Sequence, residues 1–311
     1  MNGTVEKALH LWGLSGSEYR LIAARENQVF KVRTDDQSFA LRLHRQGYRS
    51  DVELSSELQW METVSIGGIK VPTPIPAQSG ELLQIVDGTQ VDVLDWLSGA
   101  PMAETVQALN STQRVKLFNT IGIEMARLHL ISDAWIQPDE FARCAWDRAG
   151  LLGNEPLWDC FWENPGLSAE DRKLFITMRA KAVMDLSQVE AHLDYGLIHA
   201  DLVPANILVD DDRIQIIDFD DGGFGFRLFE LATALAKFAF DDDFDELRIA
   251  LINGYTRLRE IDTNQLDLFI FLRSATYVGW NIARMDEQGA SSRNERFIGE
   301  ARQLALAYLS K

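Results

Sequence analysis

The residues with the clearest chemical potential lie in two short segments of the C-terminal half. Residues 199–206 read HADLVPAN, with the spacing H-x-D-x-x-x-x-N, and residues 217–220 read IDFD. In phosphoryl transfer a carboxylate orients the attacking hydroxyl and accepts its proton, while amide and carboxylate oxygens are hard ligands that suit Mg²⁺. The spacing therefore predicts Asp201 as the catalytic base, and Asn206 and Asp218 as ligands of the metal.

The same residues have an alternative interpretation without catalysis. Asp, Asn and Pro are common in turns for conformational reasons, so the two segments could be a capped loop and a solvated acidic turn. The acidic turn at the expected distance, preceded by a pair of short strands, favours phosphoryl transfer. We expect His199 to be structural and to hydrogen-bond the metal-binding turn.

Short strands dominate the first part of the chain. Segments rich in apolar residues, several bounded by turn residues, predict strands at 19–24, 28–33, 38–44, 81–86 and 90–96. The turn at 34–37 predicts a hairpin between the second and third of these strands. Apolar residues at helical spacing predict a helix over 51–64, which Gly67 ends. The prolines in 71–76 predict an extended segment.

The remainder of the chain has mostly helical patterns. One apolar stripe predicts a helix over 111–130, a capping box at Ser168 predicts the start of another, and several amphipathic helices follow Arg227. Two short strands, 207–209 and 213–217, flank the acidic turn 210–212. A β-rich part followed by a helical part predicts an α+β fold with a cleft at their junction.

The composition excludes some classes of partner. Thirty Lys and Arg residues against 47 Asp and Glu residues give a formal net charge of −17. Such a surface repels nucleic acid and anionic membranes and attracts cations, although the charge could serve solubility alone. Cys144 and Cys160 form no disulfide framework. The first residues show neither the basic segment nor the long apolar stretch that is typical of a signal peptide, and residues 228–240 are too short and charged for a membrane span. We therefore expect a cytoplasmic protein.

The two motifs resemble those of the aminoglycoside phosphotransferase-like kinase superfamily. Its members include antibiotic kinases, choline kinases, homoserine kinases of the second type and a stress-response protein kinase, and their motifs read H-G-D-x-x-x-x-N and I-D-[FW]-[DE]. Ala200 stands where the family usually has glycine. The resemblance implies a two-lobed protein-kinase-like fold. The N-terminal lobe would comprise residues 1–95 and the C-terminal lobe residues 96–311, with a substrate-binding insertion at about 133–165.

The resemblance also implies a nucleotide site in the N-terminal lobe. The segment FALR at 39–42 lies where kinases carry V-A-I-K, so Ala40 would face adenine and Arg42 the α- and β-phosphates. The alternative for Arg42 is a surface arginine. Glu57 matches the helix glutamate that pairs with this cation, and Glu53 is the competing choice.

Three further residues complete the expected ATP site. No glycine-rich nucleotide loop occurs, and the family usually replaces it with a hairpin that carries Asn, here Asn27. A plain turn is the alternative role for Asn27. Asp95 and Leu97 lie in the segment that resembles the family's hinge, where adenine bonds to backbone groups. Glu230 lies where the family often has Asp, and we expect it to be structural.

The insertion mixes aromatic residues with carboxylates. We expect Trp146, Asp147, Trp158 and Asp220 to contribute to the acceptor site, because aromatic faces and carboxylates together can hold a cationic amine. The alternative is that the tryptophans only pack the insertion on the lobe.

These observations lead to one functional hypothesis and two rivals. The leading hypothesis is an ATP- and Mg²⁺-dependent kinase that phosphorylates a hydroxyl of a small, amine-bearing metabolite or antibiotic. The rivals are a protein Ser/Thr kinase of the stress-response type and a non-catalytic nucleotide-binding module.

Overall fold

The computed structural model describes residues 2–24, 27–210 and 213–310, which form two compact units. The first unit comprises Met1–Glu104, Leu130–Arg143 and Asn206–Asp220, and the second comprises Thr105–His129, Cys144–Ala205 and Asp221–Lys311. Two pairs of residues lie outside the described residues: Arg25 and Glu26, which precede Asn27 in the hairpin expected from the family resemblance, and Asp211 and Asp212 of the predicted acidic turn.

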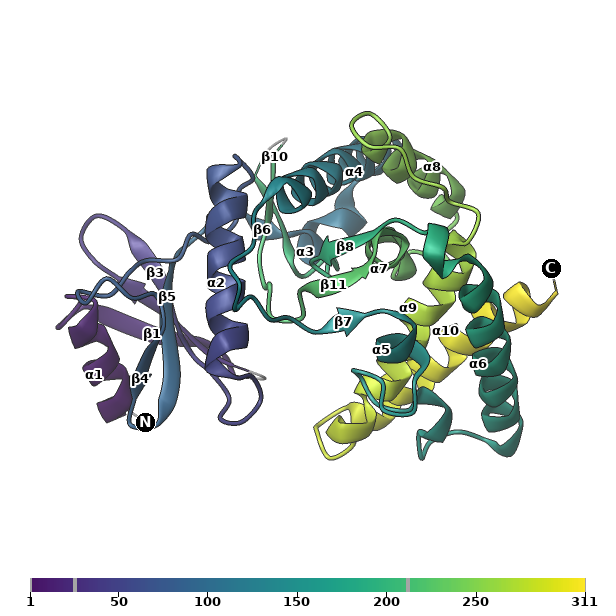
Figure 1. Cartoon of the computed structure of the whole chain (residues 1–311), viewed down its shortest axis with the longest axis horizontal. Coiled ribbons are helices and arrows are strands. Elements are labelled where there is room, and N and C mark those ends of the chain that lie inside the picture. The colour runs from purple at the N-terminus through teal and green to yellow at the C-terminus, as the bar shows by residue number, and fades with distance from the viewer. Residues whose placement is uncertain (1, 25–26, 211–212, 311) are drawn as a thin grey trace. The chain divides into compact units, whose positions relative to one another are not determined.

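The first unit contains a five-stranded antiparallel sheet with the order β1-β2-β3-β5-β4 (Figure 1). Its strands are β1 (Glu18–Ala24), β2 (Gln28–Arg33), β3 (Ser38–Leu43), β4 (Gln84–Val86) and β5 (Thr89–Asp95). Asp87 and Gly88 both have positive φ, which suits the two-residue turn between β4 and β5. The strands predicted from the sequence are present, although β4 is shorter than the predicted 81–86.

Successive side chains along each strand point to opposite faces of this sheet. Phe39 and Leu41 of β3 and Val91 and Val93 of β5 are buried in one cluster with α1 (Asn2–Leu11). Intervening residues such as Arg42 and Asp92 must therefore point to the other face, where α2 (Asp51–Ile66) lies (Figure 1). The sequence patterns did not predict α1.

Helix α2 has clear start and stop signals. Ser50 accepts a hydrogen bond from the backbone N–H of Glu53, and the Glu53 side chain accepts one from the backbone N–H of Ser50. This capping box satisfies donors that the first helical turn leaves unpaired. Gly67 caps the C-terminal end, as predicted. The buried residues of α2 include the predicted apolar stripe together with Glu57.

A small antiparallel sheet completes the first unit. It has the order β10-β9-β6 and consists of β6 (Ala100–Pro101), β9 (Ile207–Asp210) and β10 (Arg213–Ile216). The backbone N–H of Ile216 also donates to the carbonyl of Lys70, 2.9 Å away. These pairings explain why residues 206–220, which are distant in sequence, belong to the same compact unit as the N-terminal residues.

The second unit is mainly helical. A three-stranded sheet, with the order β7-β11-β8, is formed by β7 (Ala145–Trp146), β8 (Tyr195–Ile198) and β11 (Gly223–Phe226). The remaining helices of the chain, some at the boundaries of the units, are α3 (Met102–Thr105), α4 (Ser111–Ala134), α5 (Arg148–Leu152), α6 (Ala169–Val189), α7 (Arg227–Ala236), α8 (Phe244–Tyr255), α9 (Leu266–Trp280) and α10 (Ala290–Leu309), with 3-10 turns at Val106–Ala108, Phe161–Glu163, Glu190–His192 and Ile282–Arg284.

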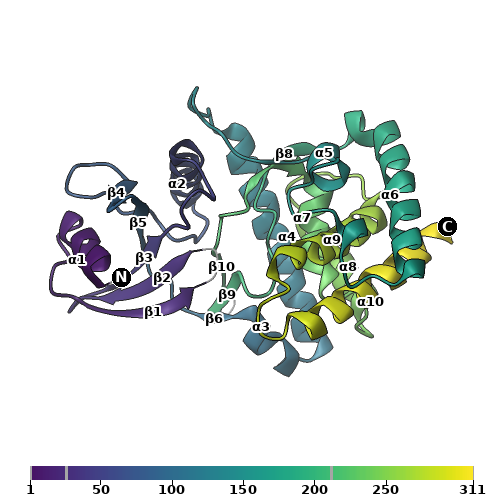
Figure 2. The ribbon, with the colours of Figure 1, turned by 90° about the horizontal axis from the view of Figure 1, so that it is seen from below.

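Helix α9 lies in the interior of the second unit. It packs against α7 and α10, which lie beside it in both views (Figures 1 and 2). Most of its residues are buried, from Leu266 to Gly279. The helices predicted at 111–130, after Ser168 and after Arg227 are all present. Across the described residues, the structure has no helix that is both long and apolar enough to cross a membrane.

Candidate functional site

The loop that carries Asp201 follows β8 in the second unit. Ala200 has φ +64° and is fully buried, so an alanine occupies the left-handed region that favours glycine. Its backbone N–H donates to Oε2 of Glu230, 2.9 Å away on α7. This bond explains how the strained backbone is held, and it is consistent with a structural role for Glu230.

Glu230 is a fully buried carboxyl group. Burial raises its pKa to about 7, although the Ala200 N–H and the nearby Arg227 and Arg273 act in the opposite direction. Asp201 adds to the increase because two carboxylates repel each other. The carboxyl group that holds the backbone of the Asp201 loop therefore has a pKa of about 7.

Asp201 forms an ion pair that the sequence patterns did not predict. Nη2 of Arg273, on α9, donates both to Oδ1 of Asp201 and to the hydroxyl of Tyr277, the latter over 2.9 Å. The Asp201 side chain is 20% exposed, whereas that of Arg273 is fully buried. The only sequence signal for Arg273 was a charged residue within the apolar run FIFLRSA.

The predicted metal ligands come from neighbouring strand ends in the first unit. Asn206 directly precedes β9 and Asp218 follows β10, and the N–H of Ile217 donates to the carbonyl of Asn206 over 3.0 Å. Asp218 has an exposed side chain and a φ of +70°. One amide and one carboxylate oxygen donor fit Mg²⁺, which keeps several water and phosphate ligands. When bound, Mg²⁺ would neutralise phosphate charge.

The turn that carries Asp218, the predicted metal ligand, is anchored to α2. The ring of Phe219 is fully buried and packs edge-on against Trp60 of α2, with ring centroids 5.1 Å apart. The side chain of Arg143 is 1% exposed and donates to the carbonyl oxygens of Phe219 and Asp220, 3.0 and 2.5 Å away.

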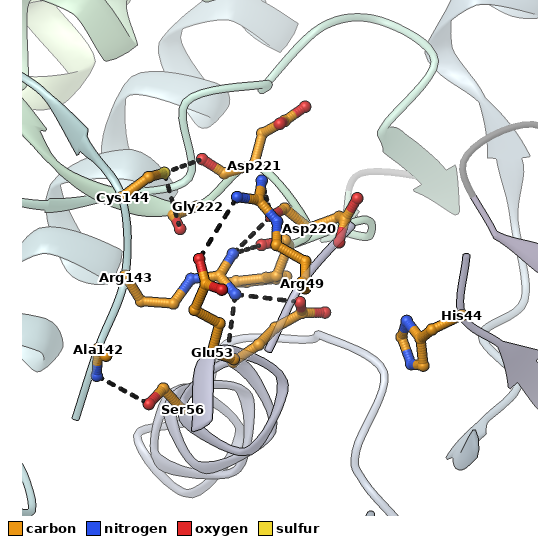
Figure 3. Close-up of polar contacts among 12 residues, drawn as sticks. His44, Arg49, Glu53, Ser56, Ala142, Arg143, Cys144, Asp220, Asp221 and Gly222 are labelled. Atoms are coloured by element: carbon orange, nitrogen blue, oxygen red, sulfur yellow. Dashed lines mark hydrogen bonds and ion pairs between the residues drawn. The ribbon is translucent and has the colours of Figure 1, made fainter. Parts of the chain in front are cut away.

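Arg143 connects this turn to two groups on α2. Its Nη1 lies 3.0 Å from the carbonyl of Glu53 and 3.4 Å from a carboxylate oxygen of Glu57. Arg49 adds a bond of 3.1 Å to the carbonyl of Asp220, and Figure 3 shows both arginines pointing toward that residue. Sequence analysis missed Arg143, because its partners are backbone carbonyls far along the chain.

The predicted ion pair between Arg42 and Glu57 is confirmed. Nη1 of Arg42 lies 2.8 Å from Glu57, while its Nε and Nη2 both donate to Asp92 over 2.8 Å. His44 also contacts Asp92, at 2.6 Å. Asp92 was not predicted, although a charged residue between buried valines in β5 was a visible signal. It lies directly opposite Arg42 in the β3–β5 register.

Electrostatics keep these buried carboxylates ionised. Burial by itself would raise the pKa of Asp92, but Arg42 and His44 hold that pKa well below its usual range. The pKa of Glu57 is likewise lowered, because Arg42 and Arg143 outweigh its burial. Each terminal nitrogen of Arg42 carries two N–H groups, and one of each is used within the described residues. The expected contact of Arg42 with phosphate oxygens stays a prediction.

The remaining predicted nucleotide residues lie in the same unit. Ala40 is partly buried on the Arg42 face of β3. The backbone N–H of Asp95 donates to Thr73 over 2.9 Å, so it is already used. Leu97 is partly buried and, across the described ranges, has no recorded hydrogen bond, which suits a backbone contact with adenine. Asn27 accepts a long bond of 3.4 Å from the N–H of Arg45. The nucleotide-binding roles of these residues stay predictions.

The four predicted acceptor residues have different environments. Trp146 is 1% exposed, stacks on Phe229 and donates to the carbonyl of Asp221, and Asp147 caps α5. These contacts match the packing alternative. Asp220 is buried, and its carbonyl is held by Arg143. Trp158 is partly buried, with Arg273 over its ring at 4.7 Å. Their acceptor roles stay predictions.

Comparison with known proteins decides the family. A model of the phosphotransferase enzyme family matches residues 18–269. The chain belongs to this family. This confirms the resemblance seen in the sequence, and the chain is therefore an ATP-dependent phosphotransferase.

Relatives of this phosphotransferase are similar along most of their length. It is 25% identical to an amicoumacin kinase of Bacillus subtilis, covering 81% of this chain and 75% of the relative, and 27% identical to a homoserine kinase of Gluconobacter oxydans, covering 76% and 71%. Among solved structures, a microcompartment-associated aminopropanol kinase has a TM-score of 0.87 at 29% identity, covering 100% of this chain and 98% of its own.

A more distant structure supports the fold. The amicoumacin kinase hAmiN, solved with AMP-PNP, Ca²⁺ and amicoumacin, has a TM-score of 0.79 at 18% identity, with 97% and 93% coverage. The two-lobed, protein-kinase-like α+β fold predicted from the sequence is confirmed.

The first prediction concerns the fork of Arg42. The guanidinium of Arg42 makes two hydrogen bonds to Asp92 and one to Glu57. In Arg42→Lys a single ammonium cannot replace all three bonds, so the free energy of unfolding should fall by about 1–3 kcal/mol. Chemical denaturation measures this, with Arg33→Lys at an exposed strand end as control. The control should change stability by less than about 0.5 kcal/mol. Equal stability of the two variants would show that Asp92 and Glu57 need only a positive charge.

The second prediction concerns the anchor of the metal-binding turn. Arg143→Met keeps apolar bulk but removes the bonds to the turn, so the Mg²⁺ concentration for half-maximal activity should rise about tenfold, equivalent to about 1.4 kcal/mol. The control is Arg148→Met, which breaks a more exposed pair with Glu190. An unchanged Mg²⁺ requirement in Arg143→Met would contradict this role.

The third prediction concerns pH. Because the folded-state pKa of Glu230 is raised to about 7, the folded state binds more protons than the unfolded state between pH 4.5 and 7. The contribution of Glu230 to stability therefore decreases as pH rises through this window. In Glu230→Gln, the loss of unfolding free energy between pH 5 and pH 8 should shrink by about 1–3 kcal/mol. The same pH dependence in wild type and variant would contradict the raised pKa.

Proposed function

We propose that this phosphotransferase uses Mg²⁺ and ATP to phosphorylate a hydroxyl of a small, amine-bearing metabolite or antibiotic. The observation that carries the proposal is the arrangement of side chains in the first unit. Arg42, the proposed phosphate ligand, is paired with Glu57 of α2, and the two proposed metal ligands lie at adjoining strand ends. Arg143 joins the turn after the second of these strands to α2. Cationic donors and metal ligands in fixed positions are what phosphoryl transfer requires.

Each group has a distinct role in this proposal. Arg42 binds phosphate oxygens and is held in place by Glu57 and Asp92. Asn206 and Asp218 hold the metal. Asp201 orients the acceptor hydroxyl and accepts its proton as the oxygen attacks phosphorus. Ala40 packs near adenine, and the backbone at Leu97 bonds to it.

The acceptor class is supported by relatives and by charge. Aminopropanol kinase is named for a small amino alcohol and homoserine kinase for a hydroxyamino acid, and both are similar to this chain over most of its length. The net charge of −17 raises the local concentration of cations. A protein substrate would instead need an open groove for an extended peptide, and the aromatic residues of the insertion pack among themselves, as Trp146 does on Trp158.

A phosphorylation screen tests this proposal. Purified protein is incubated with Mg²⁺, ATP and panels of amino alcohols, hydroxyamino acids, aminoglycosides, neutral sugars and unfolded protein, and ADP release and phosphorylated product are measured. We expect turnover with at least one amine-bearing alcohol. Preferential phosphorylation of a sugar or protein would overturn the acceptor class, and an absence of Mg²⁺-dependent turnover across all panels would favour a non-catalytic module.

The fourth prediction uses the acceptor that this screen identifies. Asp201→Asn keeps the shape of the side chain but removes its charge and its capacity to accept a proton. Turnover should fall about 100-fold or more, while ATP affinity measured by calorimetry changes little. Near-normal turnover in this variant would contradict the assignment of Asp201 as the base.

A further inference from the structure

Helix α9 carries one buried guanidinium that is joined to the catalytic loop. We propose that Arg273 is a positioning residue that fixes the orientation of the Asp201 carboxylate for phosphoryl transfer. This inference rests on the proposed function, because it takes Asp201 as the base. Arg273 itself belongs to neither sequence motif.

Burying the Arg273 guanidinium among apolar residues costs free energy unless an opposite charge compensates it. Its neighbours along α9, from Phe269 to Leu272, are apolar and buried, and its own side chain is fully buried. Removing a guanidinium from water is unfavourable unless an opposite charge compensates. Burial acts to lower the pKa of Arg273, but Tyr277 and Asp201 outweigh it and raise that pKa. The carboxylate of Asp201 therefore stabilises this buried charge.

Aromatic side chains restrict the movement of the guanidinium. Its central carbon lies 4.4 Å from the ring centroid of Tyr277, 4.7 Å from that of Trp158 and 5.8 Å from that of Phe229. Cation–π attraction favours this arrangement. Nη2 bridges Asp201 and the hydroxyl of Tyr277, while Nε and Nη1 are buried and have no hydrogen-bond partner in the described part of the chain. The cation is thus positioned by rings and by one nitrogen.

A fixed cation at Oδ1 sets the direction in which the Asp201 carboxylate faces. A well-oriented base suits phosphoryl transfer, whose loose transition state needs positioning more than strong proton abstraction.

The chemical step remains the ordinary one. The acceptor oxygen bonds to the γ-phosphorus, the bond from that phosphorus to the bridging oxygen breaks with its electron pair leaving on ADP, and the hydroxyl proton passes to Asp201. Arg273 exchanges no atom in this step. Its effect should therefore appear in kcat and should require the carboxylate of Asp201.

A double-mutant cycle separates this role from a structural one. Arg273→Gln, Asp201→Asn and the double variant are compared with wild type in steady-state kinetics with the acceptor identified by the screen. Arg273→Gln should lower kcat about 10- to 100-fold with less than about a threefold change in KM for ATP. In the Asp201→Asn background the same substitution should change kcat less than about twofold, because the residue acts through Asp201. Independent, multiplicative losses would overturn the proposal.

Two further variants guard against a folding defect. Arg273→Lys keeps the charge without the fork, and its kcat should lie between those of wild type and Arg273→Gln. This comparison still decides the matter if Arg273→Gln does not fold, because a wild-type kcat in Arg273→Lys would overturn the need for a fixed guanidinium. The matched control is Arg248→Gln. This substitution breaks a partly exposed ion pair, 2.7 Å long, between Arg248 of α8 and Asp267 of α9, and it should leave kcat unchanged.

Failure of this inference can be told apart from failure of the proposed function. If Asp201→Asn keeps near-normal turnover, the base assignment itself is wrong and the inference falls with it. If Asp201→Asn loses most of its turnover but the cycle is multiplicative, the proposed function stands and Arg273 is only structural.

Discussion

The buried carboxylate of Glu57 is the group on which the nucleotide side of the molecule depends. A charge removed from water must be paired, and Glu57 is paired with Arg42 from the sheet and with Arg143 beside the metal-binding turn. One residue of α2 therefore joins the strand that would meet the phosphates to the turn that would hold the metal. Asp92 completes the balance by holding two more nitrogens of Arg42.

The loop that carries Asp201, the proposed base, follows the same physical principle within its own unit. Asp201 is paired with the buried Arg273, and the loop backbone is held by the buried Glu230 through the N–H of Ala200. Arg42 binds Asp92 through two nitrogens of its planar guanidinium, whereas Arg273 binds Asp201 through Nη2 alone. Such preorganisation suits a chain that has no glycine-rich nucleotide loop, because positions otherwise set by backbone N–H groups must be set by side chains.

The aromatic residues of the insertion serve mainly internal contacts. Trp146 stacks on Phe229 and makes a T-shaped contact with Trp158. The guanidinium of Arg273 lies over the ring of Trp158. A cation–π contact was expected here with the amine of a substrate, whereas the structure supplies a cation from the chain itself. Selectivity for an acceptor would then depend on the partly exposed side chains around this cluster, including Tyr277 and Trp280.

The sequence by itself determined most of the elements and the chemistry-bearing motifs, because strand alternation, helix caps and the H-x-D-x-x-x-x-N spacing are local properties. It also predicted the pair between Arg42 and Glu57, which lies within a β-strand and the helix that follows it. Only the tertiary structure decided the partners of Asp92, Arg143 and Arg273. Their contacts arise from strand register and helix packing between residues that are 50 to 90 positions apart. Local patterns contain no information on such pairings, and a charged residue in an apolar run signals only that a partner exists somewhere in the fold.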